Sequence, residues 1–584
     1  MPHFPLHLSP PNRNHGELNN SKYPQLLPLA GAHVFFCWTA LRTCSSLARF
    51  ACPELLSFAW PHLSLMLRPG MRLSATTLRI AAIFFLVFTC FLFWLPHRFN
   101  HGRFFAHSYN ETSHHLRPVT ATETEAPSTP SFTPPNALTA NVKFHESNDD
   151  FWLSVAHALE DARPHCPPIV HYKHGLNKTH TAYEPLRPDK PHPQNINMTD
   201  DAEMELMREH HTMRTAAFRL APSLPFVSDT TGIVVTASPK QMSYLLVSLR
   251  MLRRTGSKLP VELFLANESE YNATLCETVL PAFNTRCVVM STIFAPKIRH
   301  FQYKIFAILL SSFQNILFLD SDAFPIHDPS PLFSTRPYTS HGLVIWPDIW
   351  GNSISSHYYH IAGIPEVPVS QRLSPETGQV MIDKHRHRES LLMMVYYNYY
   401  GPSHYYAIFS QGNAGPGDKD TFVPGAIAVD LPWYQVRTRT FMLGRWKGGQ
   451  FRMVGMGQRD PAEDFMYGGP VPNHLQGKEN WEESGMAGNT GKAAAPQLPR
   501  PMFVHQMVMK IRPGLILRPD VLSYHTDDGG WQRMWTAEED AVKTFGYDAE
   551  AVMWEVMEEA SCLAGVEPEA CDKLKEYRAA VFNG

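Results

Sequence analysis

A short hydrophobic run that ends in two carboxylates places the strongest constraint on the fold of this chain. Residues 316–319 are Ile, Leu, Phe and Leu, and Asp320 and Asp322 follow directly. Four apolar residues bounded by polar ones predict a buried strand of an α/β sheet. Open α/β sheets bind ligands beyond the carboxyl ends of their strands, so we expect both Asp side chains to face a ligand.

The spacing of these two carboxylates indicates a divalent cation. Two acids in one turn repel each other unless a cation lies between them, and carboxylate oxygens suit Mn²⁺ or Mg²⁺. A D-x-D triplet also occurs by chance in chains of this length. Its position directly after a hydrophobic strand favours a metal site at Asp320 and Asp322 that bridges to a diphosphate.

The length and charge of the chain limit its class. The chain has 584 residues, and its 51 Lys and Arg against 54 Asp and Glu give a net charge of -3. This length exceeds what one hydrophobic core usually supports, so we expect one catalytic domain with non-globular extensions. The nearly balanced charge gives no reason to expect a nucleic-acid partner.

An apolar segment near the N-terminus predicts a membrane anchor. Residues 80–95 are apolar except for Thr89, close to the shortest length that spans a bilayer. N-glycosylation sequons follow at Asn110, Asn177, Asn197, Asn267 and Asn272. We therefore predict a type II signal anchor at 80–96 with everything after it in the secretory lumen. A cleaved signal peptide is the alternative, but no A-x-A-like site follows.

Composition divides the rest of the chain. Residues 1–79 form the predicted cytoplasmic tail, whose length would be explained by an overlong gene model. Residues 97–150 are rich in Ser, Thr and Pro, which predicts an extended stem, and residues 151–584 form the predicted luminal domain. Helices are expected at 151–159 and 204–220, and the core is expected to begin at Gly232.

The order of elements predicts an α/β nucleotide-binding domain with a mixed, mostly parallel sheet. A strand, helix, strand unit makes its two strands parallel neighbours. We expect a loop or insertion at 455–499, and a C-terminal helix at 537–545 that begins with a capping box of Thr536 and Glu539. The expected strands are 232–236, 261–265, 287–290, 316–319, 342–346 and 502–505, and the expected helices between them are 244–254 and 301–313.

The cysteines after the anchor predict two disulfides. In an oxidising lumen the close pairs Cys276 with Cys287 and Cys562 with Cys571 are the candidates, which leaves Cys166 unpaired. The chain has no C-x-x-C pattern with metal spacing, so we do not expect zinc.

Short motifs follow one another between residues 232 and 421. They are GIVVT at 232–236, KLPVE at 258–262, YK at 303–304, LDSD at 319–322, WPD at 346–348, ETGQVMIDK at 376–384 and GDKDTF at 417–422. In this combination the chain resembles the fungal Golgi mannosyltransferases that extend the outer chains of cell-wall mannoproteins. The WPD block is more similar to the α-1,2 branch of that family than to the α-1,3 branch. GDKDTF departs from the GDKETF of the family.

The resemblance implies an activity and a setting. We expect a GT-A-like fold, Mn²⁺ as cofactor, and transfer of mannose from GDP-mannose to mannan or glycoprotein glycans with retention of configuration. It implies α-1,2 linkages, with α-1,3 as the alternative. It also implies a Golgi membrane protein of type II topology that uses a mannose-containing acceptor, with other mannosyltransferases as partners in a complex.

Specific residues are assigned to the donor site. The metal ligands are Asp320, Asp322 and His505, with Asp322 in direct contact and Asp320 holding ribose or binding through water. His505 ends a strand-like run, and Lys510 follows at a distance suited to a diphosphate. The residues assigned to the nucleotide sugar are Thr236, Lys304, Asp320 and Lys510. An ordinary exposed helix lysine is the alternative for Lys304.

Three carboxylates are assigned to catalysis: Asp348, Glu376 and Asp418. Retention does not require a separate general base, and a carboxylate that stabilises an oxocarbenium-like centre would suffice. Gln379 and Asp383 are further polar candidates in the same motifs. A tyrosine cluster is interpreted either as a platform for acceptor mannose or as packed core; it comprises Tyr396, Tyr397, Tyr399, Tyr400, Tyr405 and Tyr406.

Two other classes of function compete with this interpretation. A phosphatase of the haloacid dehalogenase type also places D-x-D after a hydrophobic strand, but Ala323 and Phe324 follow here where that class has Thr or Val two residues beyond the second Asp. The other class is a membrane-anchored sugar-binding protein without activity. The presence of both Asp residues and of GDKD argues against it.

Overall fold

The computed structural model describes a large part of the chain after the predicted stem. The described residues are 144, 148–172, 192–294, 297–369, 372–413, 415–466, 498–519, 521, 524–535, 538–562 and 567–582. All of them lie in one compact unit, Thr129–Gly584. The predicted anchor, most of the predicted stem and the sequons at Asn110 and Asn177 lie outside these residues. Within the described part, no helix combines the length and hydrophobicity needed to cross a bilayer.

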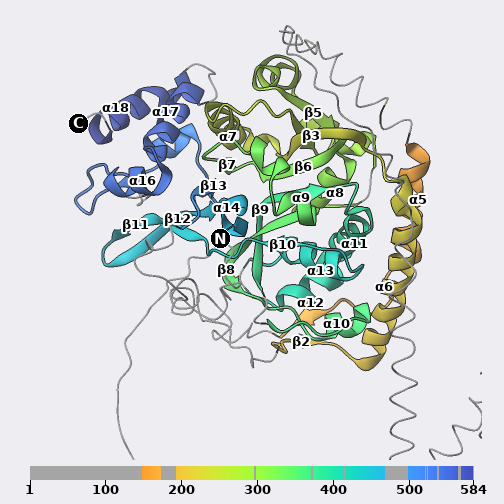
Figure 1. Cartoon of the computed structure of the whole chain (residues 1–584). Helices are drawn as coiled ribbons and strands as arrows, with labels where there is room; N and C mark the ends of the chain where they lie inside the picture. The colour runs from red at the N-terminus through yellow and green to blue at the C-terminus, as the bar shows by residue number, and fades with distance from the viewer. Residues whose placement is uncertain are drawn as a thin grey trace, which may run out of the picture. The chain divides into compact units, whose positions relative to one another are not determined.

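A seven-stranded sheet forms the centre of the unit (Figure 1). In spatial order its strands are β10 (Tyr434–Gln435), β8 (Leu343–Gly351), β9 (Leu373–Asp383), β6 (Phe313–Asp320), β3 (Val227–Thr236), β4 (Val261–Leu265) and β5 (Thr285–Val289). Only β9 runs against its neighbours, since β10 with β8 and the four strands β6, β3, β4 and β5 pair in parallel. The prediction of a mixed, mostly parallel α/β sheet is therefore confirmed.

Alternate residues of the central strands pack into two different hydrophobic clusters. Leu317 and Leu319 of β6 belong to the cluster on the side of α7 (Met242–Arg254), while Ile316 and Phe318 belong to the cluster on the side of α8 (Gln302–Leu310) and α11 (Arg388–Tyr399). Both faces of the sheet are thus covered, as expected for parallel strands.

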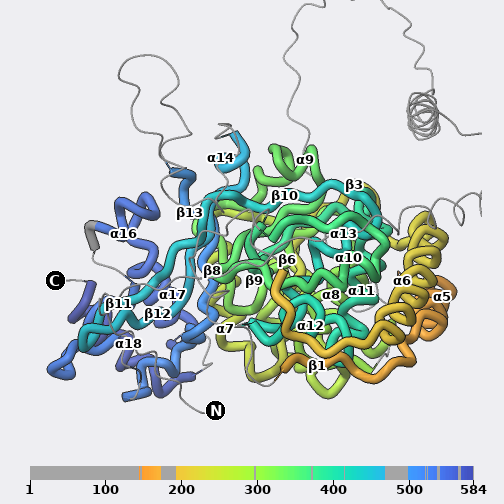
Figure 2. Tube along the Cα trace, turned by 90° about the horizontal axis from the view of Figure 1, so that it is seen from below, coloured from red at the N-terminus to blue at the C-terminus, as the bar shows by residue number. Residues whose placement is uncertain are grey.

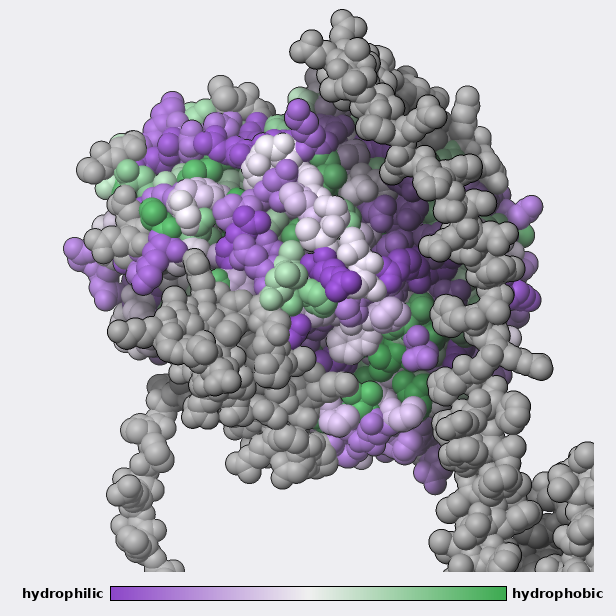
Figure 3. All heavy atoms as spheres, in the orientation of Figure 1, coloured by the Kyte–Doolittle hydropathy of each residue, from purple (hydrophilic) through white to green (hydrophobic). Residues whose placement is uncertain are grey.

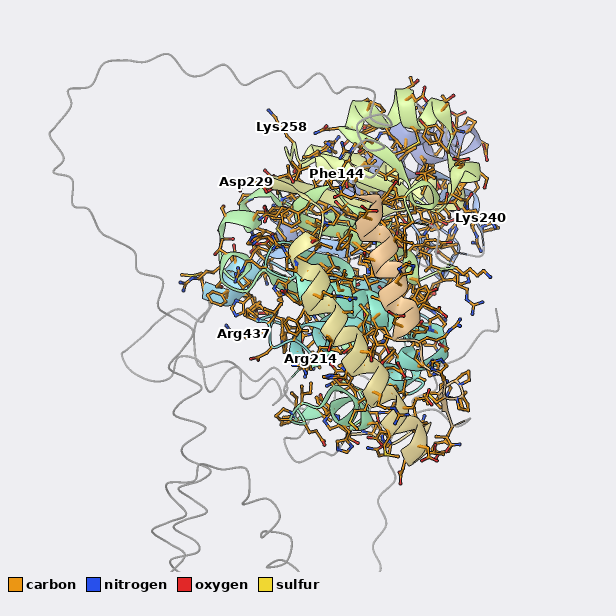
Figure 4. The ribbon with its side chains drawn as sticks, turned by 90° about the vertical axis from the view of Figure 1, so that its right-hand side faces the viewer. Phe144, Arg214, Asp229, Lys240, Lys258 and Arg437 are labelled. Carbon is orange, nitrogen blue, oxygen red and sulfur yellow. A yellow bond between two sulfur atoms is a disulfide. The ribbon has the colours of Figure 1, made fainter. Side chains whose placement is uncertain are left out.

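Two long helices extend the fold beyond the predicted core. The helix α5 (Asp149–Asp161) lies beside α6 (Asp200–Leu220), which also packs against α11 and α10 (His357–Ala362) (Figures 2 and 4). Trp152 and Leu206 are fully buried in the same cluster as β6. The expectation that the core begins at Gly232 was therefore wrong, because α6 packs against α10 and α11, α5 packs against α6, and both amphipathic helices belong to the same hydrophobic cluster as β6.

A second, four-stranded antiparallel sheet stands beside the first, on the left in Figure 1. Its order is β11 (Phe441–Lys447), β12 (Gln450–Arg459), β13 (Pro501–His505) and β7 (Ala323–Pro325). The helices α16 (Glu538–Phe545), α17 (Ala549–Cys562) and α18 (Cys571–Val581) share a hydrophobic cluster with it. The prediction of a loop over 455–499 was wrong at its start, since β12 and α14 (Pro461–Met466) occupy residues 455–466.

The remaining elements are short. They are β1 (Val170–His171), β2 (Ile196–Asn197), α9 (Tyr338–His341), α12 (Tyr406–Ser410) and α13 (Phe422–Ile427). Both predicted disulfides are confirmed, and Cys166 is a buried free thiol. Thr536 of the predicted capping box lies outside the described residues. On the side of the molecule drawn in Figure 3, hydrophilic residues cover most of the coloured surface, and a hydrophobic area lies toward the lower right.

Candidate active site

A pocket of about 830 Å³ opens where β3 and β6 end. Thr236 and Asp320 are the last residues of these strands and pair with each other in the sheet. Every residue assigned to the site from sequence lines this pocket: Thr236, Lys304, Asp320, Asp322, Asp348, Glu376, Asp418, His505 and Lys510. The structure therefore brings together residues from positions 236 to 510, while their individual roles stay predictions.

His505 reaches the Asp pair through strand pairing. Asp322 lies in the turn between β6 and β7, and β7 begins at the next residue, Ala323. Ala323 is the partner of His505 in the antiparallel pair of β7 with β13. As a result, His505 Nε2 lies 3.4 Å from Asp322 Oδ1 and 3.8 Å from Asp320 Oδ2.

These three side chains fit a divalent cation. One potential ligand atom from each of Asp320, Asp322 and His505 lies within 4.8 Å of the others. Two atoms bound to the same ion at roughly 2.0 to 2.3 Å are separated by no more than about 4.6 Å, so only a small adjustment is needed. Two carboxylates and one imidazole are ligands typical of Mn²⁺ or Mg²⁺ and include no thiolate.

Two lysines lie beside the Asp pair. Lys304 Nζ lies 3.3 Å from Asp320 and 3.1 Å from Asp418 Oδ2, and it donates to the carbonyl oxygen of Thr377 at 2.6 Å. Lys510 Nζ forms an ion pair with Asp322. Lys304 is almost completely buried, so the alternative of an ordinary exposed helix lysine is wrong.

The three carboxylates assigned to catalysis have different partners. Asp348 forms an ion pair of 2.7 Å with Lys419, and Asp418 pairs with Lys304. Glu376 Oε1 lies 2.9 Å from Nδ1 of His505. All three side chains are buried, so each depends on its partner for stabilisation.

Burial and neighbouring charges shift the pKa values of the side chains in this site. Burial disfavours the charged form of His505, but the carboxylates of Glu376 and Asp322 outweigh it and raise the His505 pKa to about 10. Burial would also raise the pKa of Asp322, yet His505 and Lys510 hold that pKa below its usual value. Burial raises the pKa of Asp320. A cation bound here must therefore displace a proton from His505.

Several residues singled out from sequence lie elsewhere. Asp383 is at the opposite end of β9, where it pairs with Asn315 at the start of β6. Gln379 lies on β9 and donates to Glu376. The centre of the tyrosine cluster is packed core, since Tyr396, Tyr397 and Tyr405 are fully buried and contact one another in tilted or edge-on arrangements, so the interpretation of these three rings as an acceptor platform was wrong.

The pocket residues that were not assigned from the sequence include Thr377, Gly378 and Lys419. Thr377 accepts from Lys304, and Lys419 is the partner of Asp348. All three lie inside motifs used for the resemblance, ETGQ at 376–379 and GDKD at 417–420. The polar residues of these motifs were therefore the signal that could have revealed them.

Comparison with known proteins finds mannosyltransferases. Residues 230–374 and 369–460 match the family model described as "Mannosyltransferase putative". Alpha-1,2-mannosyltransferase MNN21 of Candida albicans is 33% identical over 406 residues, which cover 59% of this chain and 61% of the relative. MNN24 of the same species, also an alpha-1,2-mannosyltransferase, is 40% identical over 270 residues, covering 40% and 38%. Alpha-1,2-mannosyltransferase MNN2 of Saccharomyces cerevisiae is 34% identical over 274 residues, covering 40% and 46%.

The matched segments thus span less than two thirds of each of these relatives. Among solved structures, mouse xyloside xylosyltransferase 1 aligns over 35% of this chain and 84% of that chain at 12% identity, with a TM-score of 0.24. The family match covers the segment that carries the Asp pair and the motifs around it. Residues 230–460 of this chain match the mannosyltransferase family model, and the curated relatives are alpha-1,2-mannosyltransferases.

Proposed function

We propose that this chain is a GDP-mannose-dependent α-1,2-mannosyltransferase that extends mannan or glycoprotein glycans with retention of configuration. The observation that carries the proposal is the cluster of Asp320, Asp322 and His505, flanked by Lys304 and Lys510 in one pocket. The α-1,2 linkage is supported by the relatives, each of which is named an alpha-1,2-mannosyltransferase. The match of residues 230–460 to a mannosyltransferase family model argues against the phosphatase alternative.

The donor diphosphate fits the charged end of the pocket. Asp322 and His505 would hold Mn²⁺, with Asp320 binding it directly or through water, and the bound ion would act as a Lewis acid on the departing diphosphate. Lys510 is 44% exposed at its side chain, so it can turn from Asp322 toward a phosphate once an ion takes its place. Thr236 and Ser238, at the end of β3, line the same pocket for the nucleoside.

Transfer with retention needs negative charge near the anomeric carbon rather than a separate base. The candidates for this charge are the pocket carboxylates Asp348, Glu376 and Asp418, and at least one of them supplies it in this proposal. An acceptor hydroxyl that approaches on the side of the leaving group would pass its proton to the departing phosphate. Lys304 and Lys510 would stabilise the charge that develops on that phosphate.

The proposed setting is the Golgi membrane. The apolar segment at 80–95 and the Ser, Thr and Pro-rich stem support a type II anchor with the catalytic unit in the lumen. Two confirmed disulfides are consistent with an oxidising compartment. The acceptor is a mannose-containing glycan, and other mannosyltransferases are the proposed partners.

The purified full-length chain tests the activity directly. It is incubated with Mn²⁺, mannose oligosaccharides and either GDP-mannose or another sugar nucleotide, and the product linkage is determined with linkage-specific mannosidases. We expect an α-1,2-linked mannose from GDP-mannose only. Asp322→Asn should lower the rate roughly 100-fold or more, since Lewis-acid stabilisation contributes several kcal/mol, whereas the exposed Asp527→Asn should not. Full activity in EDTA would refute the metal-dependent mechanism.

A further inference from the structure

Glu376 is held in a way that suits orientation of a histidine rather than contact with a sugar. Its Oε1 atom accepts from the backbone N–H of Gly378 and lies 2.9 Å from His505 Nδ1. Its Oε2 atom accepts from the side-chain amide of Gln379. The Glu376 side chain is buried, and these contacts engage both of its oxygens.

The contact with Glu376 determines which nitrogen of His505 is available. If Nδ1 donates its proton to Glu376, Nε2 is the nitrogen that faces Asp322 and Asp320, and loss of its proton would leave its lone pair for a cation. Metal-bound histidines usually donate their other ring N–H to a carboxylate or carbonyl, which fixes both the tautomer and the ring orientation. The arrangement of Glu376, His505 and the Asp pair has this form.

A glycine provides the space that this contact requires. A Cβ atom at position 378 would lie 2.4 Å from His505 Nδ1, 2.6 Å from His505 Cε1 and 2.7 Å from Glu376 Oε1. All three separations are shorter than real Cβ contacts. Gly378 lies within the extended strand β9 and is not among the glycines with positive φ. Space for the imidazole, and not backbone conformation, therefore accounts for glycine here.

We propose that Glu376 is a positioning residue that orients the His505 imidazole toward a divalent cation, and that Gly378 keeps open the space for this contact. The inference rests on the metal site of the proposed function. It assigns Glu376 away from the sugar and leaves Asp348 and Asp418, which pair with lysines, as the carboxylates that face the donor.

Manganese binding without donor or acceptor tests this assignment. The full-length chain and its variants are titrated with Mn²⁺, and free Mn²⁺ is measured by electron paramagnetic resonance. Glu376→Ala and Gly378→Ala should each weaken Mn²⁺ binding by about 10-fold to 100-fold, the usual effect of losing a partner of a metal-bound histidine. Glu376→Gln should bind within a few-fold of wild type, because its amide oxygen still accepts from Nδ1–H.

Asp383→Asn is the matched control, since Asp383 is a buried carboxylate at the far end of the same strand. It should leave Mn²⁺ affinity unchanged. Circular dichroism establishes which variants are folded. The two Ala variants disturb the same contact in different ways, since Glu376→Ala removes the carboxylate and Gly378→Ala fills the space beside the imidazole. A folded Glu376→Ala or Gly378→Ala protein with wild-type affinity overturns the inference, as does a Glu376→Gln protein as weak as Glu376→Ala. Absence of Mn²⁺ binding by the wild-type chain instead overturns the proposed metal site itself.

Discussion

Replacement of Lys304 by methionine tests how strongly the buried charges of the pocket depend on one another. The Lys304 side chain is 9% exposed and lies between Asp320 and Asp418, at 3.3 Å and 3.1 Å. Methionine has a similar length and no charge, so Lys304→Met leaves two carboxylates without their common cation. Removal of one partner of a buried ion pair typically costs about 3–5 kcal/mol. Because the Asp320 side chain retains 28% exposure, we expect the lower end, about 3 kcal/mol.

The measurement is the free energy of unfolding from urea denaturation at pH 8 in EDTA. Lys240→Met is the control, because Lys240 is exposed and points away from the body in Figure 4, and it should change the stability by no more than about 0.5 kcal/mol. The loss in Lys304→Met should be smaller at pH 5, where an uncompensated carboxylate takes up a proton. Adding Asp418→Asn to Lys304→Met should restore part of the stability. A loss below about 1 kcal/mol, equal at both pH values, would refute the reasoning.

Three further predictions concern stability and modification. Burial raises the pKa of Glu550 to about 7. The contribution of this group to the free energy of unfolding is therefore complete below pH 4.5 and is lost as the pH rises toward 7. In urea titrations, Glu550→Gln should remove up to about 3 kcal/mol of the decrease in stability between pH 5 and pH 8. Replacement of Cys562 and Cys571 by serine opens a loop that the disulfide closes across a separation of 9 residues, and it should lower the free energy of unfolding by about 2–3 kcal/mol. A wild-type melting temperature that does not change when reductant is added would contradict this prediction. Asn267 and Asn272 are exposed sequons, so an endoglycosidase should shift the mobility of protein from a secretory host, and the absence of any shift would contradict a luminal unit.

Local patterns predicted the parallel half of the fold because its strands are continuous hydrophobic runs. β4 and β6 contain apolar stretches of the kind buried on both faces of a parallel sheet, and each was found within a few residues of its observed bounds. β9 was missed because its sequence begins Leu-Ser-Pro-Glu-Thr-Gly-Gln, with few apolar residues. Its residues Glu376 and Thr377 are buried and line the pocket, and that requirement does not appear in a hydrophobic pattern.

The hairpin of β11 and β12 was missed although it has a local signal. Gly448 and Gly449 join the two strands with positive φ at both positions, as in the two-residue turns typical of hairpins. The strands themselves carry charged residues and glycines, which weaken the alternating pattern. For the site, His505 was correctly placed near the Asp pair, whereas its partnership with Glu376 depends on long-range contacts across 129 residues.

The Asp pair occupies a place where the chain passes from one sheet into the other. Asp320 ends β6 of the seven-stranded sheet, while Asp322 and His505 adjoin β7 and β13 of the four-stranded sheet. An ion held by all three would link the two sheets, because its ligands come from both of them. We therefore expect added Mn²⁺ to slow amide hydrogen exchange in β6 and β13 together, because a bound ion would make local opening of both strands less frequent.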